Sequence, residues 1–170
     1  MHAGKRTEEL LLRLTERGYQ GRILSIRHLE DLQKEIVGRY KEGLLDKEFY
    51  QERLTRFNFQ IPESLSEAKS IIIVVVPRPQ AQATFRRNGE IRSLILPPTY
   101  VAYDRTTKQI QDFLTEILGT WGFHVAPAAL PLKILAVRSG LGEYGRNNIC
   151  YVPGMGSFLQ LAAVYSDMPW

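Results

Sequence analysis

Apolar residues recur at helical spacing through the first part of the chain. Thr7 to Arg17 predicts a short helix that ends at Gly18, and the apolar stripe from Leu29 to Leu44 predicts a second helix. A third helix, rich in charge, is expected from Asp46 to Phe57. We therefore predict a helical N-terminal part over about residues 1–68.

The pattern becomes that of a sheet from about residue 69. Ile71 to Val76 is a run of β-branched aliphatic residues that ends at Pro77, which predicts a strand buried on both faces. The pair Asn88-Gly89 favours a tight turn, so Ala83–Phe85 and Ile91–Leu96 are expected to form a hairpin. The segment from 77 to 99 otherwise lacks periodicity.

The second half of the chain alternates further helices and strands. Thr106 and Gln109 form a capping-box pair, and apolar residues from Ile110 to Leu118 follow helical spacing, which predicts an amphipathic helix on the sheet. Phe123–Val125 is expected to be a short strand. Leu130–Val137 has a proline in its first turn and a glycine beyond its end, as a short helix does.

The tail from Ser157 to Tyr165 is almost wholly apolar and predicts a strand near the sheet centre. We expect it to pair with Ile149–Val152 across the Pro-Gly-Met-Gly turn. Together these elements predict one α+β domain over residues 1–170, with a sheet-forming core at about 69–170. Its central sheet is expected to be mixed but largely antiparallel and flanked by helices.

Composition narrows the class of protein. The chain has 170 residues, 44% of them hydrophobic, which suffices for one domain with a substantial core. A lone cysteine, Cys150, excludes disulfides and favours a reducing cytoplasm, and no apolar run approaches the roughly 20 residues of a membrane span. The net charge of +4 is interspersed with acids, so a solvated surface is favoured over a phosphate footprint. A tRNA partner is allowed but not supported.

A glycine-rich loop carries the candidate chemistry. Gly140, Gly142 and Gly145 spell the dinucleotide-binding pattern, but the order of helix, loop and strand is the reverse of what that site needs. The glycines are expected to let the backbone approach a ligand, with conformations at Gly142 and Gly145 that a side chain would oppose, as positive φ would, while the polar residues after them donate hydrogen bonds. The candidate binding residues are Gly140, Leu141, Gly142, Gly145, Arg146, Asn147, Asn148 and Ser157.

The run LAVRSGLGEYGRNNICYVPGMGSFLQLAAVYSD, residues 135–167, resembles the segment that precedes the ferredoxin-like domain of epoxyqueuosine reductases. Ser70–Pro77 resembles an early strand of that family. The motif Gly-Glu-x-Gly-Arg-Asn is also similar to a motif of corrinoid-dependent reductive dehalogenases. The resemblance implies an oxidoreductase whose nitroreductase-like domain binds cobalamin near the glycine loop. In these families two [4Fe-4S] clusters in a following domain supply the electrons.

Two positions before the motif helix depart from the family pattern, and one of them concerns proton transfer. The family carries an aspartate and a glutamate before the motif helix, where this chain has Ala126 and Leu132. Alanine cannot transfer a proton, so Tyr103 becomes the leading candidate for a proton donor, and Asp104 is expected to help cap the following helix.

The cluster domain implied by the resemblance is expected beyond residue 170, because Cys150 is the only cysteine and a [4Fe-4S] cluster needs about four. The chain is then the N-terminal domain of a longer protein or a relative without clusters, and we favour the first. Its partner would be its own or a separate ferredoxin-like domain, without which it would be inactive. An isolated domain should form a homodimer through an uncovered apolar patch, at or near Met155, Phe158, Met168 or Trp170.

Three hypotheses of different classes remain at this stage. The chain is the cobalamin-binding half of an iron–sulfur reductase, a non-catalytic domain that uses the same loop to dock a partner, or a basic module that binds tRNA. A zinc site is not favoured, because His2, His28 and His124 are scattered without ligand spacing, and His124 is expected to be structural.

Overall fold

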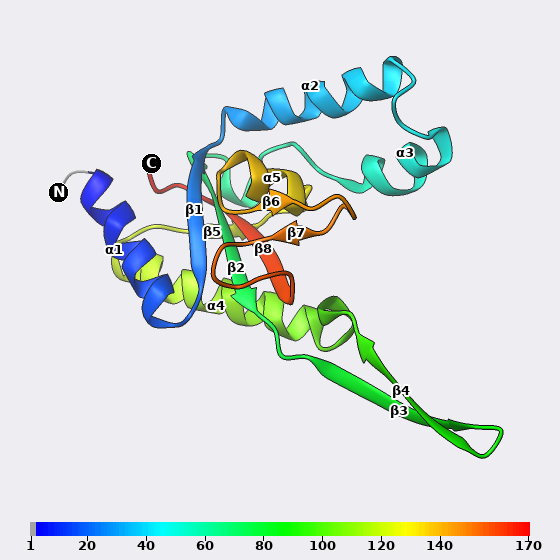
Figure 1. The fold of residues 1–170 in the computed structure, drawn as a ribbon. Helices are drawn as coiled ribbons and strands as arrows, with labels where there is room; N and C mark the ends of the chain where they lie inside the picture. The colour runs from blue at the N-terminus through cyan, green and yellow to red at the C-terminus, as the bar shows by residue number, and fades with distance from the viewer. Residues whose placement is uncertain (1–2) are drawn as a thin grey trace.

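The computed structural model describes residues 3–170, so His2 lies outside the described residues. Its main sheet has four strands, β1 (Gln20–Ser25), β2 (Ser70–Pro77), β5 (Val125–Pro127) and β8 (Leu159–Ser166), in the order β1-β2-β8-β5 (Figure 1). Each neighbouring pair in this sheet is antiparallel. The prediction of an α+β fold with a largely antiparallel central sheet flanked by helices is confirmed.

Strands β2 and β8 occupy the centre because their side chains are apolar on both faces. Ile71 to Val76 are all buried, and β8 is buried along its whole length. Alternate residues of β2 belong to two separate hydrophobic clusters, one on each side of the sheet. The unbroken apolar run is therefore the signature of a strand that helices cover on both faces.

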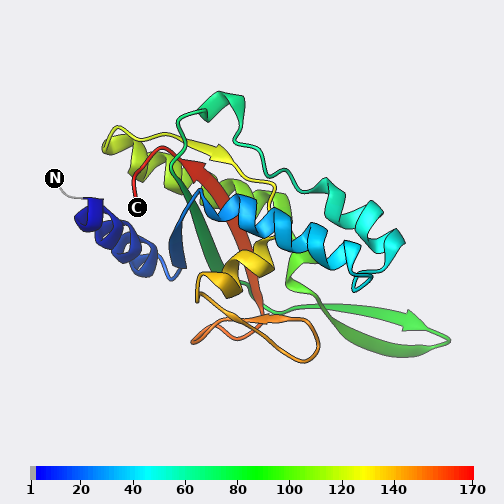
Figure 2. The ribbon, with the colours of Figure 1, turned by 90° about the horizontal axis from the view of Figure 1, so that it is seen from above.

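Four helices cover these two faces. Helices α1 (Ala3–Glu16) and α4 (Tyr103–Thr120) pack on one face, and α2 (His28–Lys41) and α5 (Leu132–Arg138) pack on the other (Figures 1 and 2). Helix α3 (Lys47–Arg53) follows α2 and begins at Asp46, whose carboxylate accepts a hydrogen bond from the amide of Phe49 at 2.8 Å. Short 3₁₀ turns lie at Leu54–Arg56, Glu63–Leu65 and Pro98–Tyr100.

Strands β3 (Ala81–Arg87) and β4 (Glu90–Leu96) form a hairpin that projects from the body of the domain (Figures 1 and 2). Asn88 and Gly89 both have positive φ, at 52° and 83°, as a two-residue turn of this kind requires. The hairpin predicted from the Asn-Gly pair is confirmed. We call residues 81–96 the arm.

Three local predictions were wrong. Strand β1 lies within the stretch that we predicted to be helical, and it forms an edge of the sheet. Strand β7 (Cys150–Tyr151) pairs with β6 (Glu143–Tyr144) and not with the tail, because β2 and β5 already occupy both edges of β8. Helix α4 begins at Tyr103, three residues before the predicted cap at Thr106, which is buried inside the first turns.

A helix that crosses a membrane needs about 20 consecutive, predominantly apolar residues. Within residues 3–170, none of the helices has both the length and the apolar character needed to cross a membrane.

Candidate functional site

The glycine loop begins where α5 ends. The Gly140 amide donates to the Val137 carbonyl at 3.1 Å, and the Leu141 amide donates to the Ala136 carbonyl at 2.9 Å. Gly140 has a φ of 69°, so this is a Schellman cap with glycine in its left-handed position. Leu141 is 1% exposed and anchors the loop in the core. The loop thus follows directly from the C-terminus of α5, and the capping hydrogen bonds of that helix fix the conformation of its first residues.

The residues after Gly142 form a small hairpin, β6–β7, whose tip is Arg146 to Asn148. The Asn148 amide donates to the Gly145 carbonyl at 3.0 Å, and the Gly145 amide donates to the Ile149 carbonyl at 2.9 Å. Asn148 has a φ of 59° and takes the left-handed position that closes such a three-residue loop. The hairpin therefore presents Arg146, Asn147 and Asn148 together at an exposed tip.

Gly142 and Gly145 have a different reason to be glycine from the one predicted. Neither has positive φ. An ideal Cβ on Gly142 would lie 2.8 Å from the Tyr151 carbonyl oxygen, and one on Gly145 would lie 2.5 Å from Cε2 of the Tyr151 ring. These glycines make room for the strand opposite within the same hairpin, so the close approach that they permit here is to the chain itself.

The polar side chains of the tip are not equally free. The Asn147 side chain accepts a hydrogen bond from the Ile149 amide at 3.2 Å and donates to the Tyr151 hydroxyl at 3.2 Å. The Asn148 carbonyl accepts a hydrogen bond from Lys133 at 3.1 Å. Arg146 and the Asn148 side chain make no hydrogen bond or ion pair among the described residues. Asn147 thus shapes the tip, whereas Arg146 and the Asn148 amide remain available.

Three large side chains surround this tip and are open to solvent. Tyr144, Ile149 and Tyr151 are 41%, 43% and 40% exposed. Burial of the rest of the Tyr144 side chain raises the pKa of its phenol, and Cys150 adds to that shift. The outer surface of β6–β7, which is the face opposite Cys150, therefore carries Ile149 and Tyr151 beside Glu143 and the polar tip, whereas Tyr144 lies on the same face as Cys150.

Cys150 lies inside the hairpin and is 3% exposed, as expected for a packed apolar side chain. Burial raises the pKa of its thiol, and Lys133 acts in the opposite direction. A buried thiol with a raised pKa is a poor nucleophile at neutral pH. Within residues 3–170, no three His, Cys, Asp or Glu side chains come together to hold a metal ion.

Ser157 and Tyr103 lie outside the hairpin. Ser157 is half-buried in the segment between β7 and β8, and Tyr103 is the first residue of α4 and 39% exposed. The Tyr103 carbonyl accepts a hydrogen bond from the Gln160 amide at 2.9 Å. Among the described residues, no hydrogen bond connects Tyr103 with the glycine loop. The structure therefore leaves the phenol accessible at the base of the arm.

A polar cluster at that base was not predicted. Arg78 donates to the Thr106 hydroxyl and to the Val101 carbonyl, so it links the two segments that enter and leave the arm. Gln160 is 1% exposed and also donates to the Thr107 hydroxyl at 2.9 Å. Nothing in the local sequence of Arg78 signals these contacts, because its partners are more than twenty residues away.

The positions that depart from the family pattern are structural. Ala126 is 4% exposed in β5, and Leu132 opens α5 half-buried. Nδ1 of His124 lies 2.9 Å from a carboxylate oxygen of Asp167, and the other oxygen of Asp167 accepts a hydrogen bond from the His124 amide. His124 thus joins the start of β5 to the end of β8, which supports its structural role.

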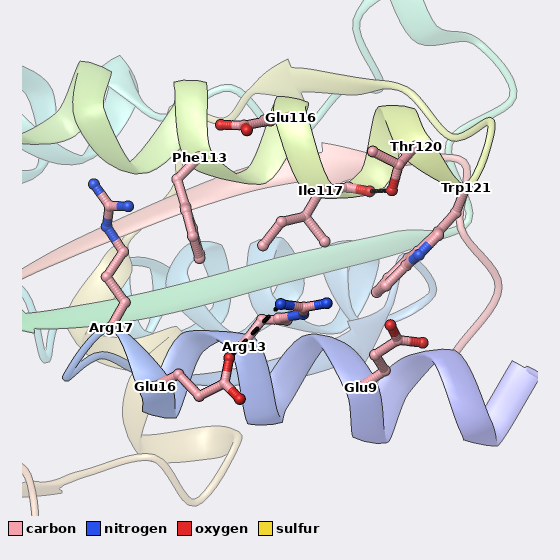
Figure 3. A pocket seen from close by; sticks show the side chains of 9 residues that line it. All are labelled: Glu9, Arg13, Glu16, Arg17, Phe113, Glu116, Ile117, Thr120 and Trp121. Atoms are coloured by element: carbon pink, nitrogen blue, oxygen red, sulfur yellow. Dashed lines mark hydrogen bonds and ion pairs between the residues drawn. The ribbon is translucent and has the colours of Figure 1, made fainter.

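Two hollows of the described surface are lined by residues away from the glycine loop. One, of about 510 Å³, lies between α1 and α4 (Figure 3). The other, of about 490 Å³, lies along α2. The outer surface of β6–β7 is exposed at Ile149 and Tyr151, and we call it the platform.

The chain matches no family model and no curated protein. Its structure is similar to that of epoxyqueuosine reductase from Bacillus subtilis, solved with its catalytic loop swung out of the active site (TM-score 0.69, 19% identity, 99% of this chain and 47% of that one). An epoxyqueuosine reductase solved with an epoxyqueuosine-modified tRNA-Tyr stem loop gives a TM-score of 0.67 at 18% identity, with the same coverage. The enzyme from Streptococcus thermophilus gives 0.60 at 20% identity, over 95% of this chain and 46% of that one.

At such low identities the similarity establishes the fold, which is that of epoxyqueuosine reductases. The chain spans about half the length of the structures that it matches.

Proposed function

We propose that this chain is an epoxyqueuosine reductase-like domain that binds a corrinoid on the outer surface of the β6–β7 hairpin. One observation carries the proposal: the segment that resembles the cobalamin-binding loop of that family forms an exposed hairpin with large apolar side chains beside free hydrogen-bond donors. The shared fold over 99% of the chain supports it.

The residues present fit the chemistry of a corrinoid on an open surface. A corrin ring offers a broad apolar face with carboxamide groups around its rim. Ile149 and Tyr151, which share one face of the hairpin, offer apolar contact area, and Arg146 and the Asn148 amide offer donors for rim amides. Bound there, the cofactor would supply reductive chemistry, and the residues of this chain would hold and orient it.

Among the described residues, the platform has no imidazole that could ligate cobalt. His124 is held by Asp167 at the far end of β8, and His28 begins α2. We therefore propose that the protein does not ligate the cobalt through histidine. The electrons would come from a partner domain or subunit with [4Fe-4S] clusters, and Tyr103 is the proposed proton donor.

Titration of the protein with cob(II)alamin, followed by visible absorbance and EPR, tests this proposal. We expect a spectral change that saturates in the micromolar range and is lost in Ile149→Asp. Ile61→Asp is the matched control, because Ile61 has a similar exposed fraction, 40%, on a different segment. Absence of binding to the wild-type protein, or an equal loss of affinity in both variants, would contradict the proposed corrinoid site.

A second candidate function has one observation in its favour. Gly142 and Gly145 accommodate the hairpin itself, so the motif also suits a non-catalytic domain that only docks a partner. Absence of corrinoid binding, together with capture of a ferredoxin-like domain by the same surface, would favour that alternative. The third alternative, a tRNA-binding module, predicts an affinity for a tRNA stem loop that falls steeply with salt.

A further inference from the structure

The arm leaves an unusual amount of apolar surface uncovered. Phe85, Ile91, Leu94 and Ile95 are 44%, 68%, 45% and 55% exposed, although they lie within a two-stranded ribbon. Such a ribbon is marginally stable in water unless another element covers it. The arm projects away from both helical layers of its own chain, so no element of that chain supplies this cover (Figures 1 and 2). By the strand register, Phe85 and Leu94 lie on one face of the arm and Ile91 and Ile95 on the other, so both faces offer apolar surface for a contact outside the described residues.

The charge of the arm limits what a partner can be. It carries Arg86, Arg87 and Arg92 against a single acid, Glu90, which is paired with Arg92 at 2.7 Å. Among the described residues, Arg86 and Arg87 have no carboxylate within ion-pair distance. A complementary surface must therefore be apolar at its floor and acidic at its rim.

The groove between α1 and α4 has this character. Phe113, Ile117 and Trp121 point from α4 toward α1 and form its apolar wall (Figure 3). Of the two arginines of the groove, Arg13 lies 3.9 Å from Glu16, and Arg17 stacks 4.7 Å from the centre of the Phe113 ring and keeps its positive charge. The three carboxylates of the lining, those of Glu9, Glu16 and Glu116, outnumber its two guanidinium groups, so the groove is acidic on balance.

The arm and the groove lie at opposite ends of the same helix. The arm leads into the N-terminus of α4, whereas the groove follows its C-terminal half. Along α4 the groove runs from Phe113 to Trp121, a length of about 13 Å, so it can hold roughly half of an arm strand of seven residues, which is about 23 Å long. Two copies related by a two-fold axis, with their α4 helices antiparallel, would each place an arm beside the groove of the other.

We propose that the arm of one copy binds in the α1–α4 groove of a second copy, and that the two copies exchange arms in a closed two-fold dimer. Arg78 ties the neck of the arm to Val101 and to α4, which gives the arm a fixed direction for this contact. The interface differs from the one predicted from sequence, of which Met168 is 1% exposed and so is buried within its own chain. It is also independent of the corrinoid site.

Sedimentation equilibrium at several concentrations tests the dimer, with the arm and the groove altered separately. We expect R86E/R87E and E9R/E116R each to raise the dimer dissociation constant at least tenfold. The quadruple variant that combines the four substitutions should recover most of the lost dimer affinity. R53E/R56E makes the same charge change on the surface of α3 and its 3₁₀ extension, and it should leave the dissociation constant unchanged. A wild-type monomer into the high micromolar range would overturn the proposal, as would a combined variant weaker than either parent.

Disulfide trapping tests which surfaces meet. Cys150 is buried, so introduced cysteines dominate the reaction. Mixed under oxidising conditions, Arg87→Cys and Glu116→Cys proteins should form a mixed disulfide in preference to either homodimer. Preferential trapping of Arg87→Cys with itself would show an arm-to-arm contact and would overturn the arm-to-groove assignment. Circular dichroism of each variant confirms that it is folded before either outcome is scored.

Discussion

Gly142 lies directly against Tyr151 across the β6–β7 hairpin, so close that an ideal Cβ on Gly142 would be 2.8 Å from the Tyr151 carbonyl oxygen. The neighbouring atoms are the Cys150 sulfur and a methyl carbon of Val152, both part of the buried side of the hairpin. A backbone oxygen cannot rotate away as a flexible side chain can. The spacing of glycines in the motif is therefore set by the packing of the hairpin.

Gly142→Ala should lower the free energy of unfolding by about 1 to 3 kcal/mol, because the hairpin must shift to admit the methyl group. Gly140→Ala is the comparison: no heavy atom lies within 4 Å of its ideal Cβ, and only its positive φ opposes the change, at a cost of about 1 kcal/mol. Urea denaturation measures both. A smaller loss at Gly142 than at Gly140 would contradict the packing explanation.

Glu35 links α2 to α5 because one of its carboxylate oxygens pairs with Arg138 and the other with Arg39, at 2.9 Å. Its side chain is 30% exposed, so Glu35→Gln should cost about 0.5 to 1 kcal/mol at low salt and less at high salt. Glu30→Gln is the control, because Glu30 and Lys34 are 81% and 73% exposed, and it should have almost no effect. Equal losses in both variants would contradict a special role of Glu35.

Tyr165 should make stability fall at alkaline pH. It is 2% exposed, and burial raises the pKa of its phenol from 10.0 to about 12. The folded chain holds the neutral phenol, so this contribution is complete below about pH 10 and is lost as the pH rises toward 12. Tyr165→Phe should remove a decline of about 2 to 3 kcal/mol over this interval.

At neutral pH the same variant should cost at most about 1 kcal/mol, since it loses only the 3.3 Å hydrogen bond to the Asn58 carbonyl. Denaturation at a series of pH values compares the two proteins. Parallel stability curves from neutral pH to pH 12 would show that the Tyr165 phenol does not titrate with a raised pKa.

Ala102 precedes α4 in a left-handed conformation, with φ 50° and ψ 39°, and no side chain caps the helix there. Because a Cβ opposes this conformation, Ala102→Gly should raise the free energy of unfolding by about 0.5 to 1 kcal/mol. Ala83→Gly, in a strand of the arm, should instead lower it by a similar amount. Thermal unfolding of both variants provides the measurement, and destabilisation by Ala102→Gly would refute the strain.

Local sequence signals identified much of the architecture. The unbroken run Ile71–Val76 indicated a central strand, the Asn88-Gly89 pair indicated the arm, and the proline and glycine around Leu132–Arg138 indicated α5. Each of these signals acts within a few residues, through β-branching, turn geometry or capping. It can therefore be recognised in the sequence without information about the rest of the fold.

What the sequence could not determine depends on residues that are distant along the chain. Strand β1 has no strong hydrophobic pattern of its own, and it is a strand because it pairs with β2. Strand β7 pairs with β6 because β2 and β5 already occupy both edges of β8. The positive φ expected at Gly142 and Gly145 lies instead at Gly140 and Asn148. Sequence alone determined which segments are apolar, bent or capped, since those properties are local. Only the tertiary structure decided which edges pair and which atoms approach each glycine, because both depend on what already occupies the neighbouring space.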